Sequence, residues 1–314
     1  MDEPMRIAPS PALARPARVR RRLRHNLTAY LFLLPALLLF GLFAWYPILR
    51  GLVISFQRVD LINPPAWVGL ANFRLIFGDP LFWRAWRNTL QFAGLALLIG
   101  YLVPVALAIA INELRHGRAY FRLAFYLPVI LPPMVSVLLW KWFYDPGYGL
   151  ANAGLRLLDL PPQPWLQSPR TAMLALVIMS TWANAGGTML IYLAALQGIP
   201  AHLYDAAEID GANLWQRLVH ITLPQLRLVM LILLVLQIIG TMQVFTEPFV
   251  MTDGGPVNAT LTVMLLLYRY AFRYNNFGAA GALGLCLFVV LASFSLLYLW
   301  LLRRSAARER GGLA

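Results

Sequence analysis

The sequence predicts an all-α, polytopic membrane protein with six transmembrane helices. Hydrophobic residues make up 60% of its 314 residues and charged residues only 12%, and the mean hydropathy is +0.65. Ordinary soluble domains are roughly 45–50% apolar and about 25% charged. Apolar stretches of about 20 residues, the length that crosses a bilayer as a helix, recur along the whole chain. A single membrane domain is therefore a better interpretation than a set of soluble domains.

The chain begins with a basic segment, residues 1–26, that is rich in Pro, Ala and Arg. This composition is typical of a flexible arm. A cleaved signal peptide is the alternative, but the apolar run that follows is too long and bulky and lacks a small-residue cleavage site. We therefore expect the first apolar run to remain as a membrane anchor.

Six apolar segments are long enough to cross a membrane as helices. They cover residues 27–49, 88–111, 121–144, 171–197, 225–247 and 278–302, within a membrane domain of residues 27–303. Residues 261–271 are apolar but too short to cross, which predicts a helix that lies at or re-enters the outer surface. Residues 304–314 are expected to form a C-terminal tail.

Basic residues are distributed unevenly around these segments. With the N-terminus inside, most of the 26 Lys and Arg residues fall in segments that face the cytoplasm, as membrane proteins prefer. This predicts that both termini and the loop 198–225 are cytoplasmic. The formal net charge of +13 is explained by membrane orientation, so nucleic-acid binding is not expected.

The sequence lacks the common catalytic and metal-binding motifs. It contains no GxxxxGK[ST] loop, HExxH helix, CxxC pair or GxSxG turn. We therefore expect no catalytic residue, no metal site and no cofactor bound by this chain. The four histidines fall in or beside predicted cytoplasmic segments, where they are expected to be solvated, and the lone Cys286 is expected to be a packing residue.

A polar segment, residues 203–224, lies between the fourth and fifth predicted spans. Its first part, 203–210, predicts a short helix whose apolar face is formed by Leu203, Ala206 and Ala207. Asp205 and Glu208 lie on the opposite face. The two carboxylates should therefore point outward, where a partner can dock.

A second short helix should follow at an angle, so that the segment forms a two-helix elbow. Gly211 ends the first helix, because a residue without Cβ readily adopts the left-handed conformation. Asn213 and Gln216 match a variant of the capping box, which starts the second helix near Leu214. Pro224 is expected to end that helix or to mark the entry to the next element.

The predicted spans carry uncharged polar groups and almost no charge. Ion-coupled transporters usually place carboxylates, His or Lys inside their spans. The polar groups either hydrogen-bond neighbouring helices or line a path for an uncharged solute such as a sugar. Lys141 and Glu247, near outer ends of spans, either snorkel to the interface or act in gating or substrate entry. The candidates for the path are Trp182, Asn184, Gln237, Thr241, Gln243 and Glu247.

The elbow resembles the signature of binding-protein-dependent ABC importer permeases. Asp205-Ala206-Ala207, Gly211 and Ile221-Thr222-Leu223-Pro224 match it in spacing, with Asp where the family usually has Glu. The similarity is closest to the carbohydrate-uptake branch, the sugar and glycerol-phosphate permeases. Motifs that carry it elsewhere are Tyr30-Leu31-Phe32-Leu33-Leu34-Pro35, Tyr46-Pro47, Val68-Gly69-Leu70-Ala71-Asn72-Phe73, Asn88-Thr89, Phe121-Arg122, Tyr126-Leu127-Pro128, Trp140-Lys141-Trp142, Gly149 with Asn152, Leu196-Gln197-Gly198-Ile199-Pro200 and Thr252-Asp253-Gly254-Gly255-Pro256.

The resemblance implies an ABC importer transmembrane domain in the inner membrane of a bacterium or archaeon, with a sugar or related polyol as substrate. The implied partners are a second permease subunit, which in this family is usually a different one, two cytoplasmic ATPase subunits that hold ATP and Mg, an external solute-binding protein and membrane lipid. The elbow would act as the coupling helices that sit on the ATPase. Its coupling residues by position are Asp205, Ala206, Ala207, Glu208, Gly211, Ile221, Leu223 and Pro224.

Two other classes remain as alternatives. An ion-coupled carrier or channel is disfavoured by the uncharged spans and by the elbow, and a membrane enzyme or structural subunit is disfavoured by the lack of catalytic motifs. If the elbow couples to an ATPase, we expect Gly211→Pro or Asp205→Arg to leave the protein inserted in the membrane but uncoupled.

Overall fold

The computed structural model describes residues 30–311, with side chains as far as Trp300, and the chain divides into two units, Met1–Ile54 and Ser55–Ala314. The expected basic arm lies outside the described residues, as do the side chains of the tail. In the first unit the described residues form one helix, Tyr30–Ile54, which is long and apolar enough to span a membrane. It contains the π-helical turn η2 (Gly41–Trp45) and ends in α2 (Tyr46–Ile54).

The second unit opens with a small antiparallel hairpin of β1 (Gln57–Arg58) and β2 (Ala66–Trp67), followed by α3 (Ala71–Gly78). The side-chain amide of Asn72 in α3 donates to the carbonyls of Ser55 and Gln57, at 2.9 Å each. These bonds join the start of α3 to the hairpin.

Helices α4 (Pro80–Leu98) and α5 (Leu102–Glu113) together form an apolar helical run of 34 residues. The run begins earlier than the predicted span 88–111, because Asp79 caps it by accepting from the Leu81 amide at 2.8 Å. Pro80 occupies the first helical position, where its missing N–H is not needed.

Helices α6 (Arg118–Ile130) and α7 (Pro133–Phe143) meet at a bend of 100°. The prediction of one regular span over 121–144 is therefore wrong in shape. Pro132 and Pro133 explain the bend, because proline lacks an amide donor and disfavours helical backbone in the residue before it. Leu131 is accordingly extended, with ψ of 138°. A short helix, α8 (Leu150–Leu157), follows α7.

Helix α9 (Ala172–Gln197) leads into α10 (Ala201–Ile209). The next three elements, α11 (Leu214–Arg217), η3 (Leu218–Thr222) and α12 (Leu223–Met242), form one continuous helix of 29 residues. Pro224 therefore does not end the second elbow helix and instead stands near the start of α12. The π-helical turn η3 directly precedes it, which accommodates a residue that cannot donate to the preceding turn.

The chain continues through η4 (Pro248–Thr252), α13 (Val263–Tyr268), η5 (Arg269–Arg273) and α14 (Phe277–Gly311). The short helix expected within 261–271 is present as α13, but its residues Val263, Leu265 and Leu266 are buried in the protein. They belong to a core that also includes side chains of α3, α4 and α14. This burial argues against a helix that lies on the outer surface and leaves a re-entrant segment as the remaining alternative.

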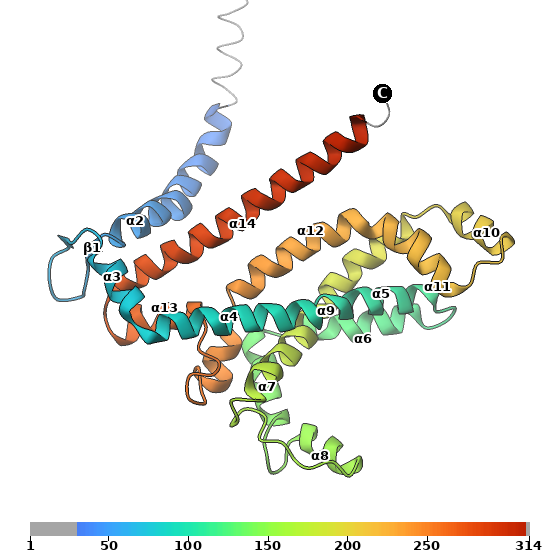
Figure 1. Ribbon diagram of the computed structural model, residues 1–314, viewed down its shortest axis with the longest axis horizontal. Helices are drawn as coiled ribbons and strands as arrows, with labels where there is room; N and C mark the ends of the chain where they lie inside the picture. Colours follow the sequence, from blue (N-terminus) through green and yellow to red (C-terminus); the bar gives the residue numbers. More distant parts are fainter. Residues whose placement is uncertain (1–29, 312–314) are drawn as a thin grey trace, which may run out of the picture. The chain divides into compact units, whose positions relative to one another are not determined.

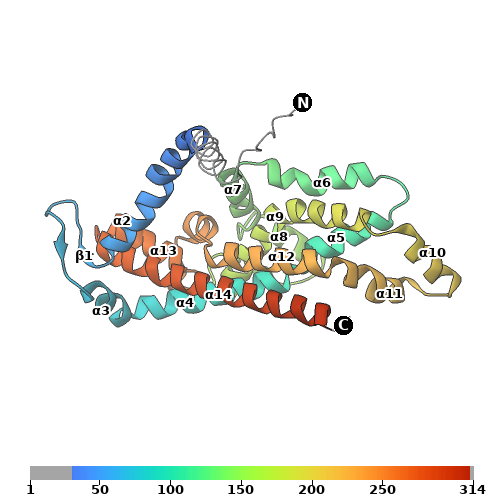
Figure 2. The ribbon, with the colours of Figure 1, turned by 90° about the horizontal axis from the view of Figure 1, so that it is seen from above.

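Two further hydrophobic cores lie in the second unit. One joins α4, α7, α9 and η4, and the other joins α5, α9 and α12. In both Figure 1 and Figure 2, α10 and α11 lie at one end of the second unit and β1 and α3 at the opposite end. Among the described residues five helices can span a membrane by length and composition, or six when α6 and α7 count as one. The all-α membrane fold is confirmed.

Candidate functional sites: an interior cavity and an exposed elbow

A polar-lined cavity of about 670 Å³ lies between α9, α12 and the segment that follows α12. Its polar lining consists mainly of hydroxyl and amide side chains. These belong to Ser180, Asn184, Thr188, Gln237, Thr241, Gln243 and Thr246, together with the carboxylate of Glu247.

Five of the six residues proposed for the solute path line this cavity, and Trp182 does not. On α9 the lining positions 180, 184, 188 and 191 repeat every three to four residues and so share one helical face. Trp182 lies on another face, where its ring contacts that of Trp140 with centroids 5.6 Å apart.

Three of the lining side chains donate hydrogen bonds to backbone carbonyls three or four residues earlier in the chain. Asn184 donates to the Ser180 carbonyl at 2.8 Å, and Thr241 donates to the Gln237 carbonyl at 2.8 Å. Gln243 donates to the Ile239 carbonyl at 3.0 Å. In the described structure these three side chains make no hydrogen bond to a neighbouring helix, which weighs against a purely structural role between helices.

Three aromatic residues of the cavity, Phe92, Tyr101 and Phe245, are not among the residues proposed from the sequence. Tyr101 lies at the junction of α4 and α5, and its hydroxyl donates to the Met230 carbonyl at 2.8 Å. The preceding Gly100 allows this junction to approach α9 and α12, since a Cβ there would lie 3.1 Å from the Thr181 hydroxyl. Glycine inside an apolar run is the sequence signal that marks this approach.

Glu247 also lines a smaller cavity of about 180 Å³ beside the bend between α6 and α7. Helix α12 ends at Met242, so Glu247 lies beyond the helix and directly precedes η4. Lys141, the other charged residue expected near a span end, donates to the Val250 carbonyl at 3.4 Å. It lines a third cavity, of about 420 Å³, together with Asp145.

The elbow has the local structure that the sequence predicts. Gly211 adopts the left-handed conformation, with φ of +75°, directly after α10. Asn213 accepts from the Gln216 amide at 2.9 Å, and Gln216 accepts from the Asn213 amide at 2.8 Å. The capping box is therefore complete, and α11 begins at Leu214 as expected.

Asp205 and Glu208 are exposed, as expected from the helical pattern. Glu208 forms an ion pair with Arg217 at 3.5 Å, but its side chain is 76% exposed, so this pair contributes little to stability. Ala206 is also exposed, whereas Ala207 is half-buried. Of the other coupling candidates, Ile221 and Leu223 are half-buried and Pro224 is exposed.

Three large apolar side chains of the elbow are exposed and were not proposed from the sequence. Ile209 is 88% exposed, and Leu214 and Trp215 are also exposed. The sequence pattern that identifies these side chains is an apolar residue on either side of the Gly211 turn in an otherwise polar segment. Carboxylates and apolar side chains together make the elbow a suitable surface for a protein partner.

The elbow connects the two helices that line the polar-lined cavity. Helix α9 runs from the cavity to the start of the elbow, and the continuous helix 214–242 runs from the elbow back to the cavity. The hydroxyls of Tyr204 in α10 and Thr222 in η3 lie 3.0 Å apart and join the two sides of the elbow.

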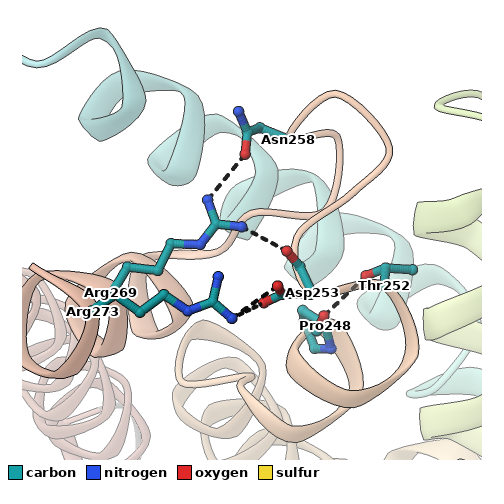
Figure 3. A network of polar contacts seen from close by, with 6 residues as sticks. All are labelled: Pro248, Thr252, Asp253, Asn258, Arg269 and Arg273. Carbon is teal, nitrogen blue, oxygen red and sulfur yellow. Dashed lines mark hydrogen bonds and ion pairs between the residues drawn. The ribbon is translucent and has the colours of Figure 1, made fainter.

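A network of polar contacts fixes the loop between η4 and α13 (Figure 3). Arg269 donates to the Asp253 carbonyl at 2.6 Å and to the Asn258 side chain at 3.1 Å. Arg273 pairs with the Asp253 carboxylate at 2.8 Å, and this hydrogen bond raises the pKa of the Arg273 guanidinium above its ordinary value. Thr252 donates to the Pro248 carbonyl at 3.0 Å. These hydrogen bonds therefore hold the glycine-rich turn in a defined conformation.

Residues 103–310 match the family model described as "Binding-protein-dependent transport system inner membrane component". The trehalose/maltose transport system permease protein MalF of Thermococcus litoralis is 34% identical over 271 residues, covering 86% of this chain and 92% of that protein. The arabinooligosaccharides transport system permease protein AraP of Bacillus subtilis is 35% identical over 273 residues, covering 86% of this chain and 87% of that protein.

Among solved structures, the chain is similar to a chain in the crystal structure of a bacterial ABC transporter involved in the import of the acidic polysaccharide alginate. The TM-score is 0.81 with 28% identity, and the match covers 91% of this chain and 99% of that chain. The bacterial alginate ABC transporter in complex with an alginate pentasaccharide-bound periplasmic protein matches with a TM-score of 0.80 and 27% identity, over 91% of this chain and 98% of that chain.

Proposed function

This chain belongs to the family of binding-protein-dependent transport system inner membrane components, and on that premise we propose that it is the permease subunit of an ATP-driven ABC importer for a sugar or related polyol. Its relatives include permeases for trehalose and maltose and for arabinooligosaccharides. The chain is a transport subunit and not an enzyme. ATP and Mg are held by a partner ATPase, and this chain itself binds no cofactor.

The observation that carries this proposal is the direct connection between elbow and cavity. One continuous helix, 214–242, begins as the second elbow helix at one end. Near its other end it carries the cavity residues Gln237 and Thr241. A displacement of the elbow by a partner is therefore transmitted along a rigid element to the solute path. Switching of the path between inward- and outward-open states requires such an element.

The elbow is the surface that we propose for the ATPase. Asp205 and Glu208 are exposed for pairing with basic groups of the partner, and Ile209 and Trp215 supply apolar contact area. Apolar anchors surrounded by charged groups are typical of specific protein interfaces. Gly211 and the capping box hold these groups in a defined arrangement.

The proposed assembly contains a second, different permease subunit, two ATPase subunits and an external solute-binding protein. The similar alginate transporter has been solved with its periplasmic protein, which supports the last of these partners. We place the protein in the inner membrane with both termini and the elbow in the cytoplasm. The excess of Lys and Arg in the corresponding segments supports this orientation.

The test is the rate of ATP hydrolysis by the purified complex in lipid nanodiscs, measured with and without the sugar-loaded binding protein. The wild-type complex is expected to respond to the loaded binding protein. Asp205→Arg reverses the charge of an exposed side chain and should abolish the response, while insertion of the chain stays normal. Arg170→Glu reverses the charge of an exposed side chain outside the elbow and serves as the control.

Two results would contradict the proposal. The first is full stimulation of the Asp205→Arg complex, which would mean that the elbow is not the docking element. The second is solute transport by this chain alone in vesicles without nucleotide, which would identify an ion-coupled carrier or channel instead.

A further inference from the structure

We propose that the solute path of this chain admits uncharged saccharides and disfavours anionic ones, because Glu247 supplies the single formal charge that the described residues contribute to the walls of its two adjoining cavities. The inference rests on the proposed function as a sugar permease and adds a substrate class to it. It concerns the cavities of about 670 and 180 Å³, which share Val129, Asn184, Thr246 and Glu247 as lining residues.

The walls of these cavities are otherwise neutral. In the described part of the chain no Lys or Arg lines either cavity. The remaining polar lining consists of hydroxyls and amides, which exchange hydrogen bonds with saccharide hydroxyls, and Tyr101 and Phe245 add aromatic surface for apolar sugar faces. Such a wall binds neutral sugars well, but it contains no group that neutralises a carboxylate or phosphate on the solute.

The charge of Glu247 is not paired within the structure. Among residues 30–300 it forms no ion pair, and its side chain is half-buried between the two cavities. Lys141, the lysine that approaches η4, donates to the Val250 carbonyl and lines the separate cavity that contains Asp145. An anion in either cavity therefore lies beside an unpaired carboxylate.

Repulsion between like charges is stronger in such a cavity than in water. The low-dielectric walls of a membrane protein focus the field of a single charge and screen it poorly. The similar transporter solved structurally imports an acidic polysaccharide, but likeness of backbone does not determine the solute, since that depends on the side chains of the path. We expect this chain to differ from that transporter in the charge of the solute that it accepts.

The test measures the electrostatic potential of the cavity with charged thiol reagents. Cys286, the lone cysteine of the chain, lines a different, apolar groove, so Cys286→Ala provides a background without reactive thiols. Thr188→Cys then places one thiol in the larger cavity. In the assembled importer, with partner subunits freed of cysteine, the rates of modification by a cationic and an anionic methanethiosulfonate are compared with those of a free thiol.

The cationic reagent is expected to be favoured by about tenfold relative to the free thiol, as focused fields permit. Glu247→Gln should bring the ratio of the cationic to the anionic modification rate close to that of the free thiol. Glu247→Asp should retain the preference for the cationic reagent. Glu113→Gln, an exposed glutamate outside both cavities, is the matched control and should leave the ratio unchanged.

A rate ratio that does not respond to Glu247→Gln, or a preference for the anionic reagent, would overturn the proposal. So would uptake of an oligouronate by the wild-type importer at the rate of an uncharged oligosaccharide of equal length. The thiol measurement needs no nucleotide, binding protein or transport. Its outcome is therefore distinguishable from a failure of the proposed transport function.

Discussion

The hydroxyl groups of Tyr204 and Thr222 lie 3.0 Å apart and hydrogen-bond the first elbow helix to the π-helical turn that leads into α12. Thr222 is buried and also approaches the Arg217 carbonyl at 3.4 Å. This contact ties together two parts of the elbow that are 18 residues apart in the sequence. A force on α10 is therefore transmitted to α12 through a side-chain bond as well as through the chain.

Loss of this bond should weaken coupling without preventing assembly. Tyr204→Phe removes one hydroxyl and should cost about 1 kcal/mol of local stability. We expect reduced stimulation of ATP hydrolysis by the loaded binding protein in the purified complex. Tyr120→Phe, at an exposed tyrosine of α6, is the control and should have no effect. Because the two hydroxyls act as a pair, adding Thr222→Val should cause little further loss beyond that of its 3.4 Å contact with the Arg217 carbonyl, and fully additive effects would show that the bond is not the cause.

Because Gly211 has left-handed backbone, Gly211→Ala should lower stability, whereas the same substitution at Gly154 should not. Gly211→Ala places a Cβ at φ of +75° and should destabilise the elbow by about 1 kcal/mol, although no other atom lies within 4 Å. Gly154→Ala in α8 has equal space and ordinary helical backbone, so it should be neutral or stabilising. Amide hydrogen exchange of the two segments measures both effects. Equal protection changes in the two variants would refute the explanation.

The neighbouring glycines of α9 should differ sharply in their tolerance of alanine. A Cβ at Gly186 would lie 2.1 Å from the Phe125 carbonyl oxygen, so Gly186→Ala must push α6 away from α9. At Gly187 the nearest atom would be a Val129 methyl carbon at 3.9 Å, an ordinary contact. We expect a loss of about 3 kcal/mol for the first and less than about 0.5 kcal/mol for the second. Thermal unfolding of the protein in detergent compares them, and similar midpoints would contradict the close packing of α6 on α9.

Two arginines of the network in Figure 3 should contribute unequally to its stability. Arg273 and Asp253 form an ion pair between side chains that are 42% and 49% exposed, and Arg273→Ala should therefore cost less than about 1 kcal/mol. Arg269 is less exposed and bonds both the Asp253 carbonyl and Asn258, so Arg269→Ala should cost about 2 kcal/mol. Limited proteolysis of the loop at 253–260 reports its opening, and the reverse order of sensitivity would contradict the assignment.

The elbow could be predicted in detail because its signals are local. The capping box of Asn213 and Gln216 and the turn at Gly211 depend on residues within one helical turn of each other. Such signals act before any tertiary contact forms, so spacing along the chain is sufficient to recognise them. Of the two roles expected for Pro224, the structure supports entry to the next element, since the proline stands at the start of α12 and η3 accommodates it.

The solute path illustrates the opposite case. A helix that is apolar on all sides carries no sequence signal for which face meets the protein interior. For that reason the sequence predicts Trp182 in the path beside Asn184, although the two lie on different faces of α9. Tyr101 was missed because its place in the cavity depends on how closely the α4 and α5 junction approaches the helices opposite it.

The sequence by itself therefore determined the membrane class, the all-α fold, the resemblance to a permease family and the local structure of the elbow. Only the tertiary structure decided that α9 and α12 meet at a polar cavity, that α6 and α7 bend apart by 100° and that Glu247 lies between two cavities. The physical reason is the range of the interactions. Composition, caps and turns act over a few residues, whereas a cavity wall is assembled from segments far apart in the chain, whose faces are selected only when the helices pack.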